Sequence, residues 1–171
     1  MKLELLQRSP HNPIIKPDDM PFLCNAVYNP GAVKFGDKYL LLPRVEDGRR
    51  DNRLHIALSD DGIHFVMNPE PVKLPPSTKH EPFEKHIYDP RITYLEGAYY
   101  ITYCAQKMDE TVRIGMVRTT DFENFERFPF ITQPWSRNCA LFPEKINGMY
   151  ARVDRPMSGN VGITWISYSP D

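Results

Sequence analysis

The chain has 171 residues, and its 21 lysines and arginines are balanced by 22 aspartates and glutamates, which gives a formal net charge of −1. This balance supplies no electrostatic attraction to nucleic acid or to an anionic membrane, so we expect neither as a partner. Seventeen prolines are spread along the chain, and aromatic residues make up 12% of it. Because proline costs about 3 kcal/mol inside a helix, no long helical run survives this distribution. The composition therefore predicts an all-β protein.

The N-terminal segment MKLELLQRSPHNPII places Glu4, Gln7 and Arg8 where a signal peptide requires an unbroken apolar stretch. No segment approaches the roughly 20 apolar residues of a transmembrane helix. The cysteines are odd in number and widely spaced, without a CxxC pair: Cys24, Cys104 and Cys139. This spacing favours buried, reduced thiols over disulfides, and the scattered histidines form no metal-ligand pattern. We expect a cytoplasmic protein without a metal site.

A proline-rich lead-in, residues 1–28, is followed by three segments of similar sequence: NPGAVKFGDKYLLLPR from Asn29, DPRITYLEGAYYITYC from Asp89 and NCALFPEKINGMYARV from Asn138. Each contains two strand-like runs separated by a turn with glycine, such as Glu96-Gly97. A unit of short strands that recurs every 50 to 60 residues or so is typical of a β-propeller blade.

The first two repeats also share an [ST]-x-D-x-x-x-F element, which runs from Ser59 to Phe65 and from Thr119 to Phe125. A third copy begins at Ser169. Such elements resemble calcium-binding or asparagine-cap motifs, but their recurrence favours a structural turn. Residues 66–86 are polar and proline-rich, and we expect them to connect two blades.

These repeats predict blades at about residues 29–65 and 89–125 and a partial blade at about 138–171. Residues 1–171 would then form the N-terminal portion of one propeller domain, contributing roughly two and a half blades. Because a propeller must close, we expect the chain to be a piece of a larger protein.

The first residues of the innermost strands lie at one mouth of a propeller's central channel, so the repeat predicts that Asn29, Asp89 and Asn138 converge there. Arginines lie near each of these residues along the chain: Arg44, Arg91, Arg137 and Arg155. One carboxylate among several guanidinium groups suits an anionic or polyhydroxylated ligand. The alternative is that Asn-Pro and Asp-Pro simply begin turns, and that each arginine is solvated or paired with a carboxylate.

The segments NPGAVKFGDKYLLLPRVE, LHIALSDDGIHF, YDPRITYLEGAYYITYCA and RNCALFPEKINGMYARVDRP closely resemble glycoside hydrolase family 130. The likeness runs from about residue 20 to the end of the chain. It implies a five-bladed β-propeller fold and, for most of the family, inverting phosphorolysis of mannosides.

The resemblance also implies a role for individual residues. Asp89 in DPRIT matches the proton donor of the family, and Asn29 and Arg44 match positions that hold the mannosyl unit. The inorganic phosphate site is matched by Arg137, Asn138 and Arg155, to which Lys145 in PEKING adds charge. Tyr88, which we also expect to contact the sugar, stands before the acid, where many relatives have glutamate. This substitution points to the branch that acts on mannosyl-N-acetylglucosamine, mannosyl-glucose or β-1,4-manno-oligosaccharides.

These matches fit one reaction in physical terms. An inverting hydrolase needs a second carboxylate to activate water, whereas phosphate arrives already anionic and needs no base. We expect Asp89 to protonate the glycosidic oxygen while phosphate attacks and forms α-mannose 1-phosphate, with no cofactor besides phosphate as co-substrate. The alternatives are a β-mannoside hydrolase of the same fold and a non-catalytic sugar-binding or assembly module. The 171-residue chain alone is expected to be inactive, and a homo-oligomer stays open.

Overall fold

The computed structural model describes residues 7–159 and 161–171 and confirms the all-β prediction. Its helical content is limited to two 3₁₀ turns, η1 (Pro17–Asp19) and η2 (Glu81–Phe83). The first six residues of the predicted lead-in lie outside the described residues. In the part of the chain that is described, no helix is long and apolar enough to cross a membrane.

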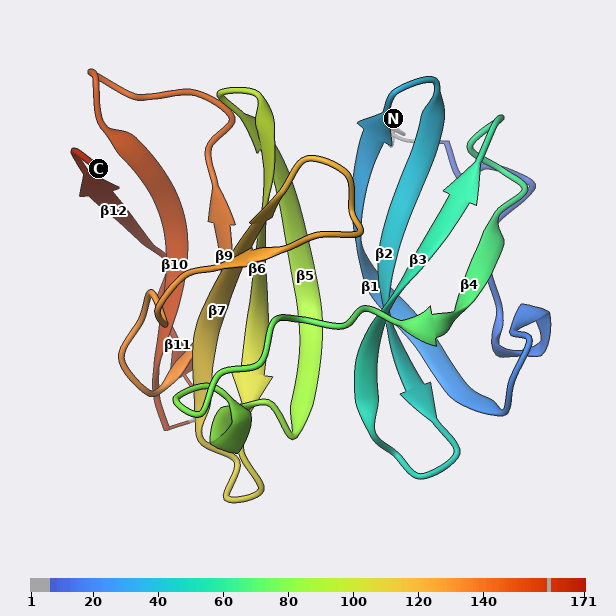
Figure 1. Cartoon of the computed structure of the whole chain (residues 1–171), viewed down its shortest axis with the longest axis horizontal. Helices are drawn as coiled ribbons and strands as arrows, with labels where there is room; N and C mark the ends of the chain where they lie inside the picture. Colours follow the sequence, from blue (N-terminus) through green and yellow to red (C-terminus); the bar gives the residue numbers. More distant parts are fainter. Residues whose placement is uncertain (1–6, 160) are drawn as a thin grey trace, which may run out of the picture.

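The strands form three antiparallel sheets that stand side by side (Figure 1). Sheet 1 contains β1 (Cys24–Phe35), β2 (Lys38–Asp47), β3 (Asn52–Ser59) and β4 (Val66–Pro71), in that order. Sheet 2 repeats this order with β5 (His86–Leu95), β6 (Ala98–Gln106), β7 (Val112–Thr119) and β8 (Glu126–Arg127). In sheet 3, β9 (Ser136–Leu141) pairs with β10 (Tyr150–Ser158), which pairs with β12 (Trp165–Ser169) and, at its end, with β11 (Val161–Gly162).

The strands extend beyond the ranges predicted for the repeats. β1 starts at Cys24, β5 at His86 and β9 at Ser136, each before the residue expected to open its repeat. The fourth strand of sheet 1, Val66–Pro71, lies in the segment 66–86 that the sequence predicted to be a connection. Pro69 and Pro71 within it masked this short edge strand, where a missing N–H is tolerated.

The three repeat openers are bulge residues inside the first strand of each sheet. Asn29, Asp89 and Asn138 have φ angles of 46°, 52° and 58°, in the left-handed region. At each bulge two residues oppose one on the partner strand. The extra residue lies between Tyr28 and Gly31 in β1 and between Tyr88 and Arg91 in β5. In β9 the two bulge residues oppose the single residue of β10 that lies between Asp154 and Pro156. Asn and Asp tolerate this conformation better than other non-glycine residues. The bulge therefore explains why the repeat begins with Asn or Asp.

The [ST]-x-D elements are structural turns. Ser59 Oγ accepts hydrogen bonds from the backbone N–H groups of Asp61 and Gly62. Thr119 Oγ1 accepts the equivalent bonds from Asp121 and Phe122. Each aspartate then accepts two further backbone N–H bonds within the turn. Because the turn itself occupies the side chains that could bind an ion, the structural interpretation holds.

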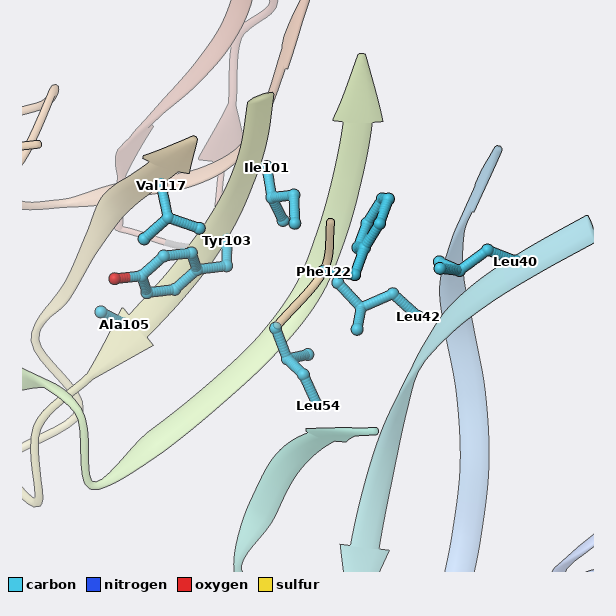
Figure 2. Packing of buried hydrophobic residues seen from close by; sticks show 8 residues of the cluster. All are labelled: Leu40, Leu42, Leu54, Ile101, Tyr103, Ala105, Val117 and Phe122. Atoms are coloured by element: carbon cyan, nitrogen blue, oxygen red, sulfur yellow. The ribbon is translucent and has the colours of Figure 1, made fainter. Parts of the chain in front are cut away.

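The core lies between neighbouring sheets. Leu40, Leu42 and Leu54 of sheet 1 face Ile101 and other residues of sheet 2, including Phe122 from the second [ST]-x-D turn (Figure 2). A second cluster joins sheet 2 to sheet 3: Tyr88, Cys104, Val112, Ile114 and Cys139. Burial of these apolar faces fixes the spacing of β1, β5 and β9, and with it the positions of the three bulges.

Candidate active site

Asp89 lies at the bulge of β5, between sheets 1 and 2. Its side chain is 13% exposed, and its Oδ1 atom accepts hydrogen bonds from Asn29 Nδ2 at 2.9 Å and from Arg44 Nη1 at 3.4 Å. Within the described residues Oδ2 forms no hydrogen bond. One carboxylate oxygen is thus held in place and the other is left for a ligand. This half-open arrangement suits a group that delivers a proton at a fixed position.

Sheets 1 and 2 approach closely enough to allow this contact because Gly31 follows the bulge of β1. A Cβ atom at Gly31 would lie 2.8 Å from Cγ1 of Ile92 and 3.3 Å from the backbone oxygen of Pro90. Any larger residue would push β1 away from β5. The glycine of the NPG sequence therefore holds Asn29 within reach of Asp89.

The guanidinium group of Arg44 lies over two aromatic rings, which together clamp it. Its guanidinium carbon lies 4.4 Å from the ring centre of Tyr28 and 4.5 Å from that of Tyr88. Nε donates a hydrogen bond of 2.6 Å to Oδ1 of Asn52. Stacking between two rings and a hydrogen bond in the guanidinium plane fix both the position and the rotation of this cation.

Tyr88 supports the clamp and does not extend into open space. The residue is 4% exposed, and its hydroxyl donates a 2.6 Å hydrogen bond to Oε1 of Gln106. Burial raises the pKa of Tyr88 to about 12. The predicted sugar contact of Tyr88 would thus have to be made through its ring edge, because its hydroxyl is already used.

Three of the four predicted phosphate residues come together at the bulge of β9. Arg137 and Asn138 lie opposite Arg155 across the β9–β10 ladder. Cys104 of sheet 2 anchors this bulge, since its Sγ atom accepts from the Asn138 N–H at 3.4 Å and lies 3.6 Å from Asn138 Oδ1. Burial raises the pKa of the Cys104 thiol to about 11, and the charges of Asp89, Arg137 and Arg155 all act on this thiol. The bulge of β9 therefore lies close enough to Asp89 for the acid and both arginines to affect the same thiol.

Neither of these arginines is neutralised. In the part of the chain that is described, Arg137 and Arg155 form no ion pair, and the buried Nε of Arg155 has no hydrogen-bond partner. A buried N–H donor without a partner is costly, and a bound anion would satisfy it. Gly162 of β11 leaves room for the Arg155 side chain, because a Cβ atom at this glycine would come within 2.9 Å of it.

Lys145 lies apart from this group. Its ammonium group is 3.1 Å from Glu96 Oε1 and 4.2 Å from the ring centre of Tyr150. Glu96 is at the far end of β5 from Asp89, about 20 Å along an extended strand. The structure gives no support to the predicted phosphate contact of Lys145, because its charge is paired with a carboxylate elsewhere.

Sequence reasoning missed three residues that shape the site: Tyr28, Asn52 and Cys104. A signal existed for Tyr28, since both Asn29 and Asp89 are preceded by tyrosine. Asn52 and Cys104 carried none, because their roles depend on pairing between strands. Among the described residues, no group of three or more potential metal ligands is found.

The chain is similar to known proteins over most of its length. Residues 7–171 match the family model of glycoside hydrolase family 130, described as β-1,4-mannooligosaccharide phosphorylase. The chain is 35% identical to a β-1,4-mannooligosaccharide phosphorylase from Ruminococcus albus, over 98% of this chain and 52% of that protein. It is also 35% identical to a 4-O-β-D-mannosyl-D-glucose phosphorylase from Bacteroides fragilis, over 82% of this chain and 40% of that protein.

Among solved structures, a β-1,2-mannobiose phosphorylase from Listeria innocua, in complex with β-1,2-mannobiose, is similar with a TM-score of 0.80 and 25% identity. That similarity covers 96% of this chain and 62% of the Listeria protein. A β-fructofuranosidase from Bombyx mori, 19% identical with a TM-score of 0.65, shares the fold. The chain spans about half the length of the curated relatives it matches. The family model, matched over residues 7–171, and the 35% identity to the Ruminococcus protein show that the chain belongs to glycoside hydrolase family 130.

Proposed function

We propose that the complete protein containing this chain is an inverting β-mannoside phosphorylase that forms α-mannose 1-phosphate. The observation that carries the proposal is that Asp89 keeps one carboxylate oxygen without a hydrogen bond, while Arg137 and Arg155, at the bulge of the neighbouring sheet, have no carboxylate partner among the described residues. A hydrolase of inverting type would need a second carboxylate about 6.5–9.5 Å away to activate water. Phosphate needs cations to bind it and no base to activate it.

In this proposal Asn29 and Arg44 hold Oδ1 of Asp89 and the mannosyl unit next to it. Oδ2 carries the proton to the glycosidic oxygen. Arg137, Asn138 and Arg155 bind phosphate on the opposite side of the sugar ring, from which it attacks C1. The bond to the leaving sugar breaks as the bond to phosphate forms, so the configuration inverts.

We further propose that the chain contributes its three sheets to a five-bladed propeller, with residues 1–171 as its N-terminal portion. Similarity to structures of the family and the repeated four-stranded order of sheets 1 and 2 support this proposal. Sheet 3 leaves apolar side chains exposed at its outer strand, with Trp165 59%, Ile166 52% and Tyr168 49% accessible. Residues from further blades would cover them, and the fragment alone would be inactive.

The proposed substrates are β-1,4-manno-oligosaccharides, mannosyl-glucose or mannosyl-N-acetylglucosamine. Tyr88 before the acid and the two relatives with 35% identity support this group. We also propose that the protein works in the cytoplasm without a cofactor, with phosphate as co-substrate. Its three cysteines are all free, as expected in a reducing compartment.

The test is to incubate the complete enzyme with β-1,4-mannobiose and mannosyl-glucose, with and without phosphate, and to follow α-mannose 1-phosphate by ³¹P NMR. We expect product only with phosphate. Asp89→Asn should lower turnover by about 10²–10⁴-fold while sugar binding persists, because only proton donation is lost. Release of mannose at an equal rate without phosphate would establish a hydrolase, and binding without cleavage would establish a sugar-binding module.

A further inference from the structure

Asn52 lies at the centre of the contacts that orient Arg44. It is the first residue of β3 and is 6% exposed. Its Oδ1 atom accepts the 2.6 Å hydrogen bond from Arg44 Nε and a longer one, 3.4 Å, from the Tyr28 hydroxyl. One buried carbonyl oxygen thus holds both the cation and one of the two rings that clamp it.

Asn52 also connects this clamp to the strand that carries the acid. Its backbone N–H donates to Nδ1 of His86 at 3.4 Å, and His86 is the first residue of β5, three positions before Asp89. The same residue is therefore in contact with sheet 1 through its side chain and with sheet 2 through its backbone. A shift of Asn52 would move Arg44 relative to Asp89.

The neutral charge of Asn52 is as important as its position. A carboxylate here would accept the same hydrogen bond but would form a buried ion pair with Arg44. That pairing would draw the guanidinium toward β3 and away from Asp89, to which it is paired at 3.4 Å. An apolar residue would leave the Nε–H donor without a partner, which is costly in a buried site.

We propose that Asn52 is a positioning residue that sets the orientation of Arg44 in the mannoside site. This inference rests on the proposed function, since Arg44 is assigned there to the mannosyl unit. Asn52 acts through Arg44 and does not itself contact the reacting atoms. Its effect on catalysis should therefore disappear when Arg44 is absent.

A double-mutant cycle in the complete enzyme tests the inference. Asn52→Ala and Asn52→Asp should each lower kcat/KM for the mannoside at least tenfold, with the KM for phosphate changed less than twofold. In an Arg44→Ala background the same substitutions should have less than a threefold further effect, because the residue through which they act is gone. Asn68→Ala, a polar residue of β4 in the same sheet, is the matched control and should retain wild-type kinetics.

Two results would overturn the inference: wild-type kinetics in Asn52→Ala, or an undiminished loss in the Arg44→Ala background. Thermal unfolding of each variant identifies loss of fold, and Asn52→Ser, which keeps a short acceptor, should recover part of the activity. Solvent exchange of the Arg44 Nε–H, followed by ¹⁵N NMR, supplies a readout independent of activity. Slow exchange of this N–H in the wild type and fast exchange in Asn52→Ala would support the positioning role. This holds even if the enzyme cleaved no mannoside, because absence of cleavage would reject only the proposed function. Equal exchange in both proteins would overturn the inference.

Discussion

At the scale of single residues, the site depends on backbone conformation as much as on side-chain chemistry. Asn29, Asp89 and Asn138 adopt left-handed φ angles at bulges of three different strands. The Asn29 side chain bonds to Asp89, and the Asn138 side chain lies against Cys104. A bulge re-aims one side chain without breaking the strand around it. The acid, a sugar-binding candidate and a phosphate-binding candidate thus each lie at a β-bulge in the first strand of a sheet.

The two arginines opposite each other at the β9 bulge should bind phosphate unequally. Arg155 has a buried Nε without a partner among the described residues, whereas Arg137 is exposed. We expect Arg155→Ala to raise the KM for phosphate at least tenfold and more than Arg137→Ala, because a buried charge-assisted hydrogen bond is stronger than an exposed one. Initial rates over a phosphate series measure this effect. An unchanged phosphate KM in both variants would contradict the assignment, and Arg118→Ala, on β7, is the control.

At the scale of the elements, sheet 2 is stabilised by a close fit between β6 and β7. Tyr103 is 1% exposed and lies opposite Gly115, and its hydroxyl donates to Glu84 at 2.8 Å while accepting from Arg127 at 3.1 Å. Glu84 and Arg127 also form a buried ion pair with each other. These contacts join the connection that follows β4, which contains Glu84, to the outer strand of sheet 2, β8, which contains Arg127.

Gly115→Ala should therefore destabilise the fold. A Cβ atom at this position would lie 2.3 Å from Cζ of Tyr103, whose hydroxyl is held on both sides and which has no free space to move into. We expect a loss of about 1–3 kcal/mol in the free energy of unfolding, as for other overpacked cores. Urea denaturation measures this loss.

Gly48→Ala is the matched control for this experiment. Its Cβ atom would approach only the side chain of Leu23, to 2.6 Å, and Leu23 is 79% exposed and free to move away. Its stability should stay within about 0.5 kcal/mol of the wild type. Equal losses in both variants would show that the Tyr103 contact is not the cause.

At the scale of the whole molecule, stability should depend on pH through three histidines. His55, His80 and His86 have a pKa lowered from the usual value of 6.5, and in each case burial is the largest cause. Below pH 6.5 the unfolded chain consequently binds more protons at these positions than the folded chain. The stability that they contribute is fully present above pH 6.5 and is lost as the pH falls below it, toward the lowered pKa values.

We expect the urea midpoint to fall between pH 7.5 and pH 5.5, and each histidine to contribute at most about 1.4 kcal/mol per pH unit. Replacing the three histidines with glutamine should flatten the dependence in this window. The exposed His11, changed to glutamine, serves as the control and should leave the slope as it is. A slope that persists in the triple variant would assign the pH dependence to other groups.

The sequence by itself determined the all-β class, the positions of the repeats and the turns that close them. Local causes were enough for this, because proline distribution, glycine turns and the [ST]-x-D elements act within a few residues of each other. Asp89, Arg44, Arg137 and Arg155 could also be singled out, from their place in the repeat and from their match to a known family. Strand limits were less predictable, since β4 and the residues before each bulge carry no local signal.

Only the tertiary structure decided how these residues meet. The hydrogen bond from Asn29 to Asp89 joins residues 60 positions apart and requires the close approach of β1 and β5 at Gly31. The role of Asn52, the anchoring of Asn138 by Cys104 and the separation of Lys145 from the acid likewise depend on the pairing of strands and the packing of sheets. Such contacts are set by burial of apolar faces between distant segments, and that information is spread over the whole chain.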